Sequence, residues 1–229
     1  MKLLLFDIDG TLVSTGGAGV RALNRAFLNV VGLVNAMEGV RPHGKTDPAI
    51  VREVFTNRGQ ECPSSDTVGQ ILDAYVGYLP EEVKESVTYR VLPGIIRFLQ
   101  DFQDRTDLAF GLATGNVELG ARIKLERGGL NTYFRFGGFG SDAEDRADLI
   151  RHAARSGARH AGCSVDPRDV FVIGDTPRDI HAGREAGFQT VGVATSDYSR
   201  DDLRSAGADA VLSDFEADRD QFLRVTRIE

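Results

Sequence analysis

Two aspartates, Asp7 and Asp9, follow the apolar run KLLLF at the start of the chain, and Gly10 and Thr11 come directly after them. Acids that end a strand have a simple structural explanation, because Asp favours turns in which its side chain hydrogen-bonds the nearby backbone. They also have a chemical one, since a carboxylate can attack as a nucleophile and a second carboxylate can move protons. The residues that end the other strands decide between these two interpretations.

Further polar residues end later strand-like runs. Thr114 ends LAFGLAT, Asp175 follows DVFVIG, and Asp179 lies four residues further on. Ligands of open parallel sheets bind beyond the carboxyl ends of the strands, so these side chains and Asp7 are expected to meet at one edge. Gathered carboxylates repel each other unless a cation relieves them, and Mg²⁺ prefers such oxygen ligands together with a phosphate. The set therefore predicts phosphoryl transfer through an aspartyl-phosphate.

The motifs resemble those of the haloacid dehalogenase superfamily of aspartate-nucleophile phosphohydrolases, in particular its capped members similar to phosphoglycolate phosphatase. DIDGT at 7–11 looks like the first motif, Thr114 the second and GDTPRD at 174–179 the fourth. The resemblance covers nearly the whole chain. It implies a Rossmann-like core, a mobile cap inserted after the first motif, and Mg²⁺ as the cofactor.

The resemblance also implies a role for each motif residue. Asp7 would be the nucleophile and a metal ligand, and Asp9 would be the general acid and base with its backbone carbonyl on the metal. Asp175 would be a further metal ligand, and Asp179 would support the metal shell. Thr114 would bind the transferring phosphoryl group.

The third motif departs from the family pattern, which supplies a lysine between the second and fourth motifs. This chain has no lysine after Lys124, and only four of its 27 basic residues are lysines, so an arginine is the expected substitute. Among Arg135, Arg146 and Arg151 we favour Arg146, because GSDAEDRADLI follows a strand and places it in the first turn of a helix. A guanidinium can bridge phosphoryl and nucleophile oxygens as a fork. Lys124 is the alternative.

The order of elements predicts an α/β fold. The strand-like runs are KLLLFDI, LAFGLAT, YFRFGGFG, DVFVIGD, QTVGVAT and DAVLS, and helical segments separate most of them. This alternation is typical of a parallel sheet covered by helices on both faces. One interval, residues 15–86, is helical throughout. We therefore expect an α/β core at 1–14 and 87–229 with an all-helical cap at 15–86 inserted after the first strand.

Apolar residues at three-and-four spacing define three helices within the predicted cap. They are Val20, Leu23, Phe27, Val30 and Val31; Ile50, Val51, Val54 and Phe55; and Val68, Ile71, Leu72, Tyr75 and Leu79. The second helix is expected to begin with Asp47 as N-cap and Pro48 in its first turn, and to end at Gly59. The run VLPGIIRFLQDF then marks the return to the core.

The turn RPHGKTDPAI of the predicted cap combines basic residues with a helix start, which favours an anionic group of the substrate. Lys45 and Arg41 are the candidate substrate contacts. The structural alternative is that Thr46 and Asp47 only cap the helix and that Lys45 is a solvated charge. Asn116, just past Thr114, either binds substrate or caps the next helix, and capping is the favoured interpretation.

Composition excludes several classes. The net charge of −7 and the lack of a basic block argue against nucleic acid as a partner. The apolar run at the start is too short for a signal-peptide core or a membrane span, so we expect a cytoplasmic protein without a membrane partner. Cys62 and Cys163 lack metal-ligand spacing, which fits a reduced compartment. The oligomeric state stays open.

Other activities of similar folds fit less well. A dehalogenase would not need Asp9 or the Asp175 and Asp179 pair, because halide leaves without a proton or a metal. A phosphonate hydrolase would need a cap lysine, for which Lys45 is the only candidate, and its family lacks an acid at position 9. A sugar phosphomutase stays open. A phospho-receiver domain is smaller and lacks a long helical insertion, and a silent phosphate-binding protein would have no need of Asp7.

The sequence therefore predicts a Mg²⁺-dependent phosphomonoesterase. Its substrate is expected to be a small-molecule phosphate ester, and phosphoglycolate is the first candidate.

Overall fold

The sheet of this chain is parallel, and its central strand is the first one. In the computed structural model, which describes residues 1–228, six strands pair in the order β5-β4-β1-β6-β7-β8, each neighbour parallel to the next. The strands are β1 (Lys2–Phe6), β4 (Leu108–Thr114), β5 (Gly137–Phe139), β6 (Val170–Gly174), β7 (Gln189–Val193) and β8 (Ala210–Leu212). The chain builds β4 and β5 on one side of β1 and then β6 to β8 on the other. This reversal creates a crevice beside β1, where ligands of such sheets bind.

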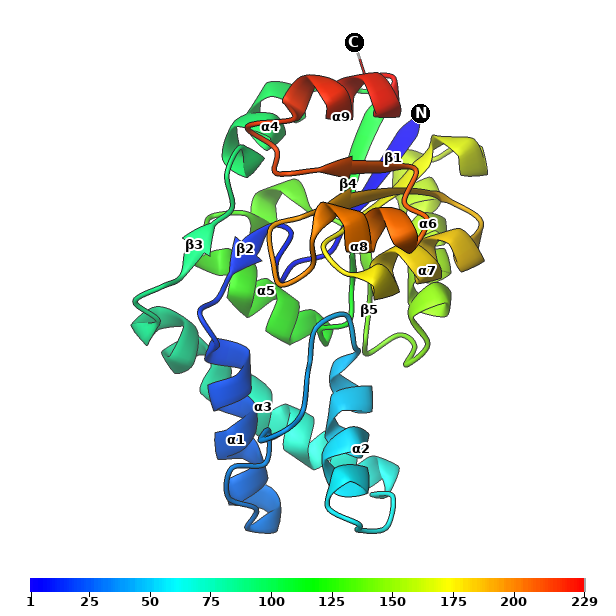
Figure 1. The fold of residues 1–229 in the computed structure, drawn as a ribbon. Coiled ribbons are helices and arrows are strands. Elements are labelled where there is room, and N and C mark those ends of the chain that lie inside the picture. Colours follow the sequence, from blue (N-terminus) through cyan, green and yellow to red (C-terminus); the bar gives the residue numbers. More distant parts are fainter. Residues whose placement is uncertain (229) are drawn as a thin grey trace.

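Helices cover both faces of the sheet (Figure 1). On one face lie α4 (Ile95–Phe102), α5 (Glu118–Glu126) and α9 (Arg219–Thr226); on the other lie α6 (Arg146–Ala161) and α7 (Pro177–Ala186); α8 (Arg200–Ser205) packs beside β7 and β8. Leu4 and Phe6 of β1 belong to the first face and Leu3 and Leu5 to the second, because successive side chains of a strand alternate. The apolar run that opens the chain is therefore buried on both faces.

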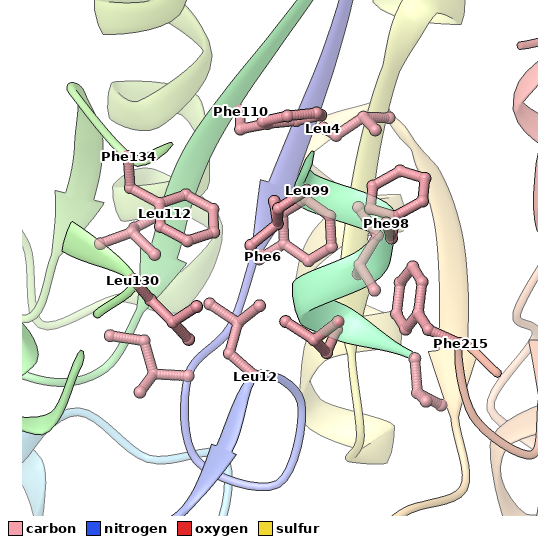
Figure 2. Packing of buried hydrophobic residues seen from close by; sticks show 14 of the residues in the cluster. Leu4, Phe6, Leu12, Phe98, Leu99, Phe110, Leu112, Leu130, Phe134 and Phe215 are labelled. Atoms are coloured by element: carbon pink, nitrogen blue, oxygen red, sulfur yellow. The ribbon is translucent and has the colours of Figure 1, made fainter. Parts of the chain in front are cut away.

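Phe6, the last residue of β1, lies in an aromatic cluster (Figure 2). Its ring centroid is 5.8–6.3 Å from those of Phe98, Phe110, Phe134 and Phe215. Burying a phenylalanine side chain contributes about 1.5–3 kcal/mol. The cluster therefore fixes the end of β1 directly before Asp7.

Three helices form a separate unit away from the sheet, which we call the helical unit. They are α1 (Ala18–Val31), α2 (Asp47–Asn57) and α3 (Ser65–Glu85), and they share an apolar cluster of their own that includes Phe27, Val54 and Tyr75. Figure 1 shows the helical unit at the end of the sheet opposite the two termini. The antiparallel pair β2 (Val13–Ser14) and β3 (Arg90–Val91) joins it to the core. None of the helices in residues 1–228 is both long and apolar enough to cross a membrane.

Three details differ from the sequence-based expectations. The third helix extends beyond Leu79, the last residue of its apolar pattern, through Pro80 to Glu85. Of the run YFRFGGFG, only Gly137–Phe139 is a strand, because Asn131–Tyr133 forms a short 3₁₀ helix before it. The N-cap of α2 is Thr46, so Asp47 is its first helical residue.

Candidate active site

The carboxyl ends of three neighbouring strands meet at one cavity. Asp7 directly follows β1, Thr114 is the last residue of β4, and Asp175 directly follows β6. All three side chains are buried and line a cavity of about 410 Å³ that continues into the helical unit, where Val20 and Tyr75 line it. The structure therefore brings the sequence-predicted residues of all three strands together.

Gly10 allows the turn after β1 to pass directly over Asp175. Its φ is +82°, a left-handed conformation that glycine adopts without strain. A Cβ atom at this position would collide with the Asp175 carboxylate. The glycine of the DIDGT run is thus required by both backbone conformation and space.

Three buried carboxylates crowd the core side of the cavity. Asp7, Asp175 and Asp179 each offer an oxygen within 4.8 Å of the others. Burial raises the pKa of Asp7 to about 7; the charge of Arg146 opposes this rise, and the charges of Asp179 and Asp9 add to it. Burial and the charges of Asp179 and Asp7 likewise raise the pKa of Asp175 well above its usual range.

This carboxylate group fits a divalent cation. Among the described residues, Asp175 Oδ2 is a buried oxygen without a hydrogen-bond partner, while its Oδ1 accepts from the Thr11 hydroxyl at 3.3 Å. An orphaned buried oxygen costs free energy unless a ligand satisfies it. Hard oxygen donors that carry excess negative charge are the ligands of Mg²⁺.

Asp179 has both carboxylate oxygens engaged. Oδ2 accepts from the Thr176 hydroxyl at 2.7 Å and the Thr176 amide at 3.0 Å, which forms a capping box at the start of α7. Oδ1 accepts from Arg146 Nε at 2.9 Å. Asp179 therefore orients Arg146 and the start of α7, whereas Asp175 keeps an oxygen open to a ligand.

Arg146 lies beside Asp7. It is the first residue of α6, and its Nη2 is 3.3 Å from Asp7 Oδ1. Its Nη1 donates to the carbonyl of Gly44, in the loop of the helical unit that reaches the core, at 3.3 Å. The guanidinium thus contacts Asp7, Asp179 and the helical unit at once, which a single ammonium group would do less well because it lacks the planar fork.

Lys124, the alternative cation, contacts Asp9 instead. Its Nζ donates to Asp9 Oδ2 at 2.6 Å, and Asn116 Nδ2 donates to the same oxygen at 3.0 Å. Burial alone would raise the pKa of Asp9, but the charge of Lys124 and these hydrogen bonds lower it below its usual value. Asp9 is therefore ionised at neutral pH.

Sequence reasoning missed this pairing of Lys124 with Asp9. The signal was present, because Ala121, Lys124 and Leu125 all lie on the buried face of α5 at helical spacing. A lysine in an apolar stripe indicates a buried partner, since lysine is almost never buried unpaired.

The capping interpretation of Asn116 is wrong. The N-cap of α5 is Val117, and Asn116 instead donates to Thr114 Oγ1 at 2.8 Å as well as to Asp9. The Val117 amide donates to Asp47 Oδ2 at 2.8 Å, so a side chain from α2 of the helical unit caps α5. Burial raises the pKa of Asp47 to about 6. The Asp47 side chain therefore links the helical unit to the core. The position of Asp47 in the sequence did not indicate this contact.

The two basic residues predicted to contact substrate differ in position. Lys45 lines the cavity but is ion-paired with Glu53 of α2. Arg41 is exposed and lies outside the set of described residues that line the cavity. His43, between them, lines the cavity and lies 3.5 Å from Asp197 of the core.

Comparison with known proteins gives consistent matches along the chain. The profile of haloacid dehalogenase-like hydrolases matches residues 4–193. A phosphoglycolate phosphatase from Agrobacterium fabrum is 28% identical over 218 residues, which are 94% of this chain and 89% of that protein. A hydrolase from Pseudomonas syringae has a TM-score of 0.73 at 22% identity, covering 98% of this chain and 99% of that one. CbbY from Rhodobacter sphaeroides, solved in complex with phosphate, has a TM-score of 0.73 at 19% identity, covering 95% and 96%.

Proposed function

Because the chain belongs to the haloacid dehalogenase-like hydrolase family and is a phosphatase similar to phosphoglycolate phosphatases, we propose that it is a Mg²⁺-dependent phosphomonoesterase. In this proposal Asp7 is the nucleophile. One observation carries the proposal. Asp7 lies buried between the guanidinium of Arg146 and the carboxylate of Asp175, whose Oδ2 has no hydrogen-bond partner among the described residues. This arrangement suits a phosphoryl group and a divalent cation that share one small space.

The nucleophile acts by forming a bond to phosphorus. A carboxylate oxygen of Asp7 attacks the phosphorus of the ester, the bond to the leaving oxygen breaks, and an aspartyl-phosphate forms. Water then attacks the same phosphorus, which releases inorganic phosphate and restores Asp7. Splitting one displacement into two allows the same side chain to be regenerated in each cycle.

Asp7 and Asp175 would hold the metal, with the backbone carbonyl of Asp9 as a further ligand and Asp179 as support through Arg146 and α7. When bound, Mg²⁺ supplies positive charge that lets two anions approach each other and that favours the ionised form of Asp7. The residues of the chain do the rest. Thr114 and Arg146 bind the phosphoryl oxygens, because a hydroxyl and a guanidinium fork match that geometry.

Asp9 moves the protons. It donates one to the leaving oxygen in the first step and accepts one from the attacking water in the second. Its ionised state in the structure, paired with Lys124, is the state that accepts a proton from water. The donating state requires a proton that arrives with the substrate or from solvent.

The helical unit is proposed to act as a cap over the substrate, with residues 15–86 as the cap and residues 1–14 and 87–229 as the core. Lys45, which lines the cavity, and Arg41 are proposed to approach an anionic part of the leaving group, and Asn116 is a further substrate contact. Phosphoglycolate is the first substrate to test, because the relative from Agrobacterium fabrum is a phosphoglycolate phosphatase.

A panel of small phosphate esters, assayed with purified protein in Mg²⁺ and in EDTA, tests this function. We expect release of inorganic phosphate in Mg²⁺, none in EDTA, and inhibition by Ca²⁺, whose larger and less regular ligand shell suits in-line attack poorly. Full activity in EDTA would overturn the proposal. Isomerisation of a sugar phosphate without release of phosphate would identify a phosphomutase instead.

A further inference from the structure

Lys124 is a buried cation that the proposed chemistry leaves without a task. It lies on α5 with only 5% of its surface exposed, and it lines the active-site cavity. Holding a lysine in such a place is unfavourable unless it is paired. Its partners therefore indicate what it does.

The Lys124 ammonium lies among polar groups of the protein. Nζ donates to Asp9 Oδ2 and to Asn116 Oδ1, both at 2.6 Å, and the Tyr75 hydroxyl of α3 lies close to it. Gly19 of α1 lies on a further side, where an added Cβ would be at an ordinary contact distance of 3.5 Å from Nζ. An ammonium group has three donors. Asp9 and Asn116 therefore engage two of the three donors of Lys124, which favours a role in holding these two side chains.

The two oxygens of Asp9 are held very differently. Oδ2 accepts from Lys124 at 2.6 Å and from Asn116 at 3.0 Å, whereas Oδ1 accepts a long hydrogen bond of 3.5 Å from the Thr15 hydroxyl. Asn116 is itself anchored on Thr114 Oγ1 at 2.8 Å. The carboxylate is thus pinned through one oxygen to the residue that binds the phosphoryl group, and the other oxygen is nearly unengaged.

We propose that Lys124 is a positioning residue for proton transfer. Together with Asn116 it holds Oδ2 of Asp9, so that Oδ1 is the oxygen that exchanges a proton with the leaving group and with water. The inference rests on the proposed function, because it needs Asp9 as the acid and base. Its consequence is that removal of the ammonium group misplaces Asp9 and leaves Asp7 and the metal-binding carboxylates untouched.

The test is a double-mutant cycle of Lys124→Met and Asp9→Asn, with Lys84→Met on α3 as the matched control. Lys84 is an exposed lysine that does not line the active-site cavity, and its replacement is expected to leave all rates unchanged. The readout is the burst rate of aspartyl-phosphate formation with an alkyl phosphate and with nitrophenyl phosphate. Cooperative melting of each variant checks its fold.

We expect Lys124→Met to slow the alkyl phosphate by about 10²-fold, the scale of a misplaced catalytic group, and nitrophenyl phosphate by less. In the Asp9→Asn background, Lys124→Met should add almost nothing, because the side chain that Lys124 positions no longer acts as an acid. If Lys124→Met does not melt cooperatively, Lys124→Gln, which keeps a donor, goes through the same cycle with a smaller loss expected.

Equal losses from Lys124→Met in both backgrounds would overturn the inference, because Lys124 would then act independently of Asp9. So would an unchanged burst rate in folded Lys124→Met. Failure of the proposed function looks different: Asp9→Asn alone would then show no dependence on the leaving group, whatever residue stands at position 124.

Discussion

Asp7 and Asp9 are two residues apart and line one cavity, yet their surroundings are opposite. Asp7 shares its space with two further carboxylates and one guanidinium, and burial raises its pKa to about 7. Asp9 has a lysine and an amide on one oxygen, and these lower its pKa. The Asp7 end of the cavity therefore has more carboxylates than cationic side chains, which we call the unbalanced end. At the Asp9 end, which we call the balanced end, Lys124 neutralises the carboxylate without a ligand.

This difference supports the proposed roles, since carboxylates whose environments push their pKa values apart perform different tasks. The unbalanced end is suited to take up a cation and a phosphoryl group. The balanced end is suited to hold a carboxylate in place for proton transfer. Remote elements create the difference, because Asp175 directly follows β6, Arg146 comes from α6 and Lys124 comes from α5.

The largest effect is expected from Asp7→Asn, which removes the proposed nucleophile from the unbalanced end. An amide cannot form the acyl-phosphate, so we expect kcat to fall by a factor on the order of 10⁶, as when a protease loses its nucleophile. Phosphate release under saturating substrate measures it. Activity within about tenfold of the unaltered protein, a barrier change of only about 1.4 kcal/mol, would contradict the nucleophile assignment.

Asp9→Asn should have a smaller and more selective effect. Loss of acid–base catalysis costs about 10² to 10⁴ in rate. Alkyl phosphates should lose more of the burst rate than nitrophenyl phosphate, because nitrophenolate leaves without a proton. Mg²⁺ affinity should stay unchanged, since the Asp9 side chain points to Lys124. Equal losses for both leaving groups, with weaker Mg²⁺ binding, would make Asp9 a side-chain metal ligand.

The smallest expected effect is on the stability of the folded protein. Its pH dependence compares the two ends of the cavity without any substrate. Above pH 4 the unfolded chain holds Asp7 ionised, whereas the folded, metal-free protein keeps its proton up to a pKa of about 7. The folded state then binds more protons, so stability in EDTA should fall as pH rises from about 4 through about 7. Melting curves at pH 5 and pH 8 measure this fall.

Mg²⁺ should restore stability more at pH 8 than at pH 5. At pH 8 a hundredfold excess over Kd should raise the free energy of unfolding by about 2.7 kcal/mol. Asp7→Asn should make the fall in EDTA smaller, although the raised pKa values of Asp175 and Asp47 keep part of it, and Asp9→Asn should not, because the pKa of Asp9 is shifted in the other direction. Stability in EDTA that rises from pH 5 to pH 8 would contradict the charge imbalance at the Asp7 end.

The sequence was informative wherever one strand or one helix decides the outcome. The run LAFGLAT is β4 from its first residue to its last, and the strand ends brought Asp7, Thr114 and Asp175 to one edge because parallel strands share their direction. The position of Arg146 at a helix start was also predictable, since a strand and a capping acid precede it.

Contacts between distant elements were not predictable in this way. The sequence predicts Asp47 as the N-cap of its own helix. Its contact with the Val117 amide of α5 depends on how the helical unit packs on the core. Pro80 lies inside α3, which continues to Glu85, since packing against a buried cluster outweighs local propensity. Lys124 has the same limitation, because its partner Asp9 is 115 residues away.

Chemical trapping of the phosphorylated residue tests the central claim most directly. Asp9→Asn protein, mixed with nitrophenyl phosphate and Mg²⁺, should form the aspartyl-phosphate readily and hydrolyse it slowly, because the base that activates water is missing. Borohydride then reduces the acyl-phosphate to an alcohol, which peptide mass spectrometry locates in the chain. The account predicts the reduced residue at position 7. A reduced residue elsewhere, or none despite a burst of nitrophenolate, would contradict it.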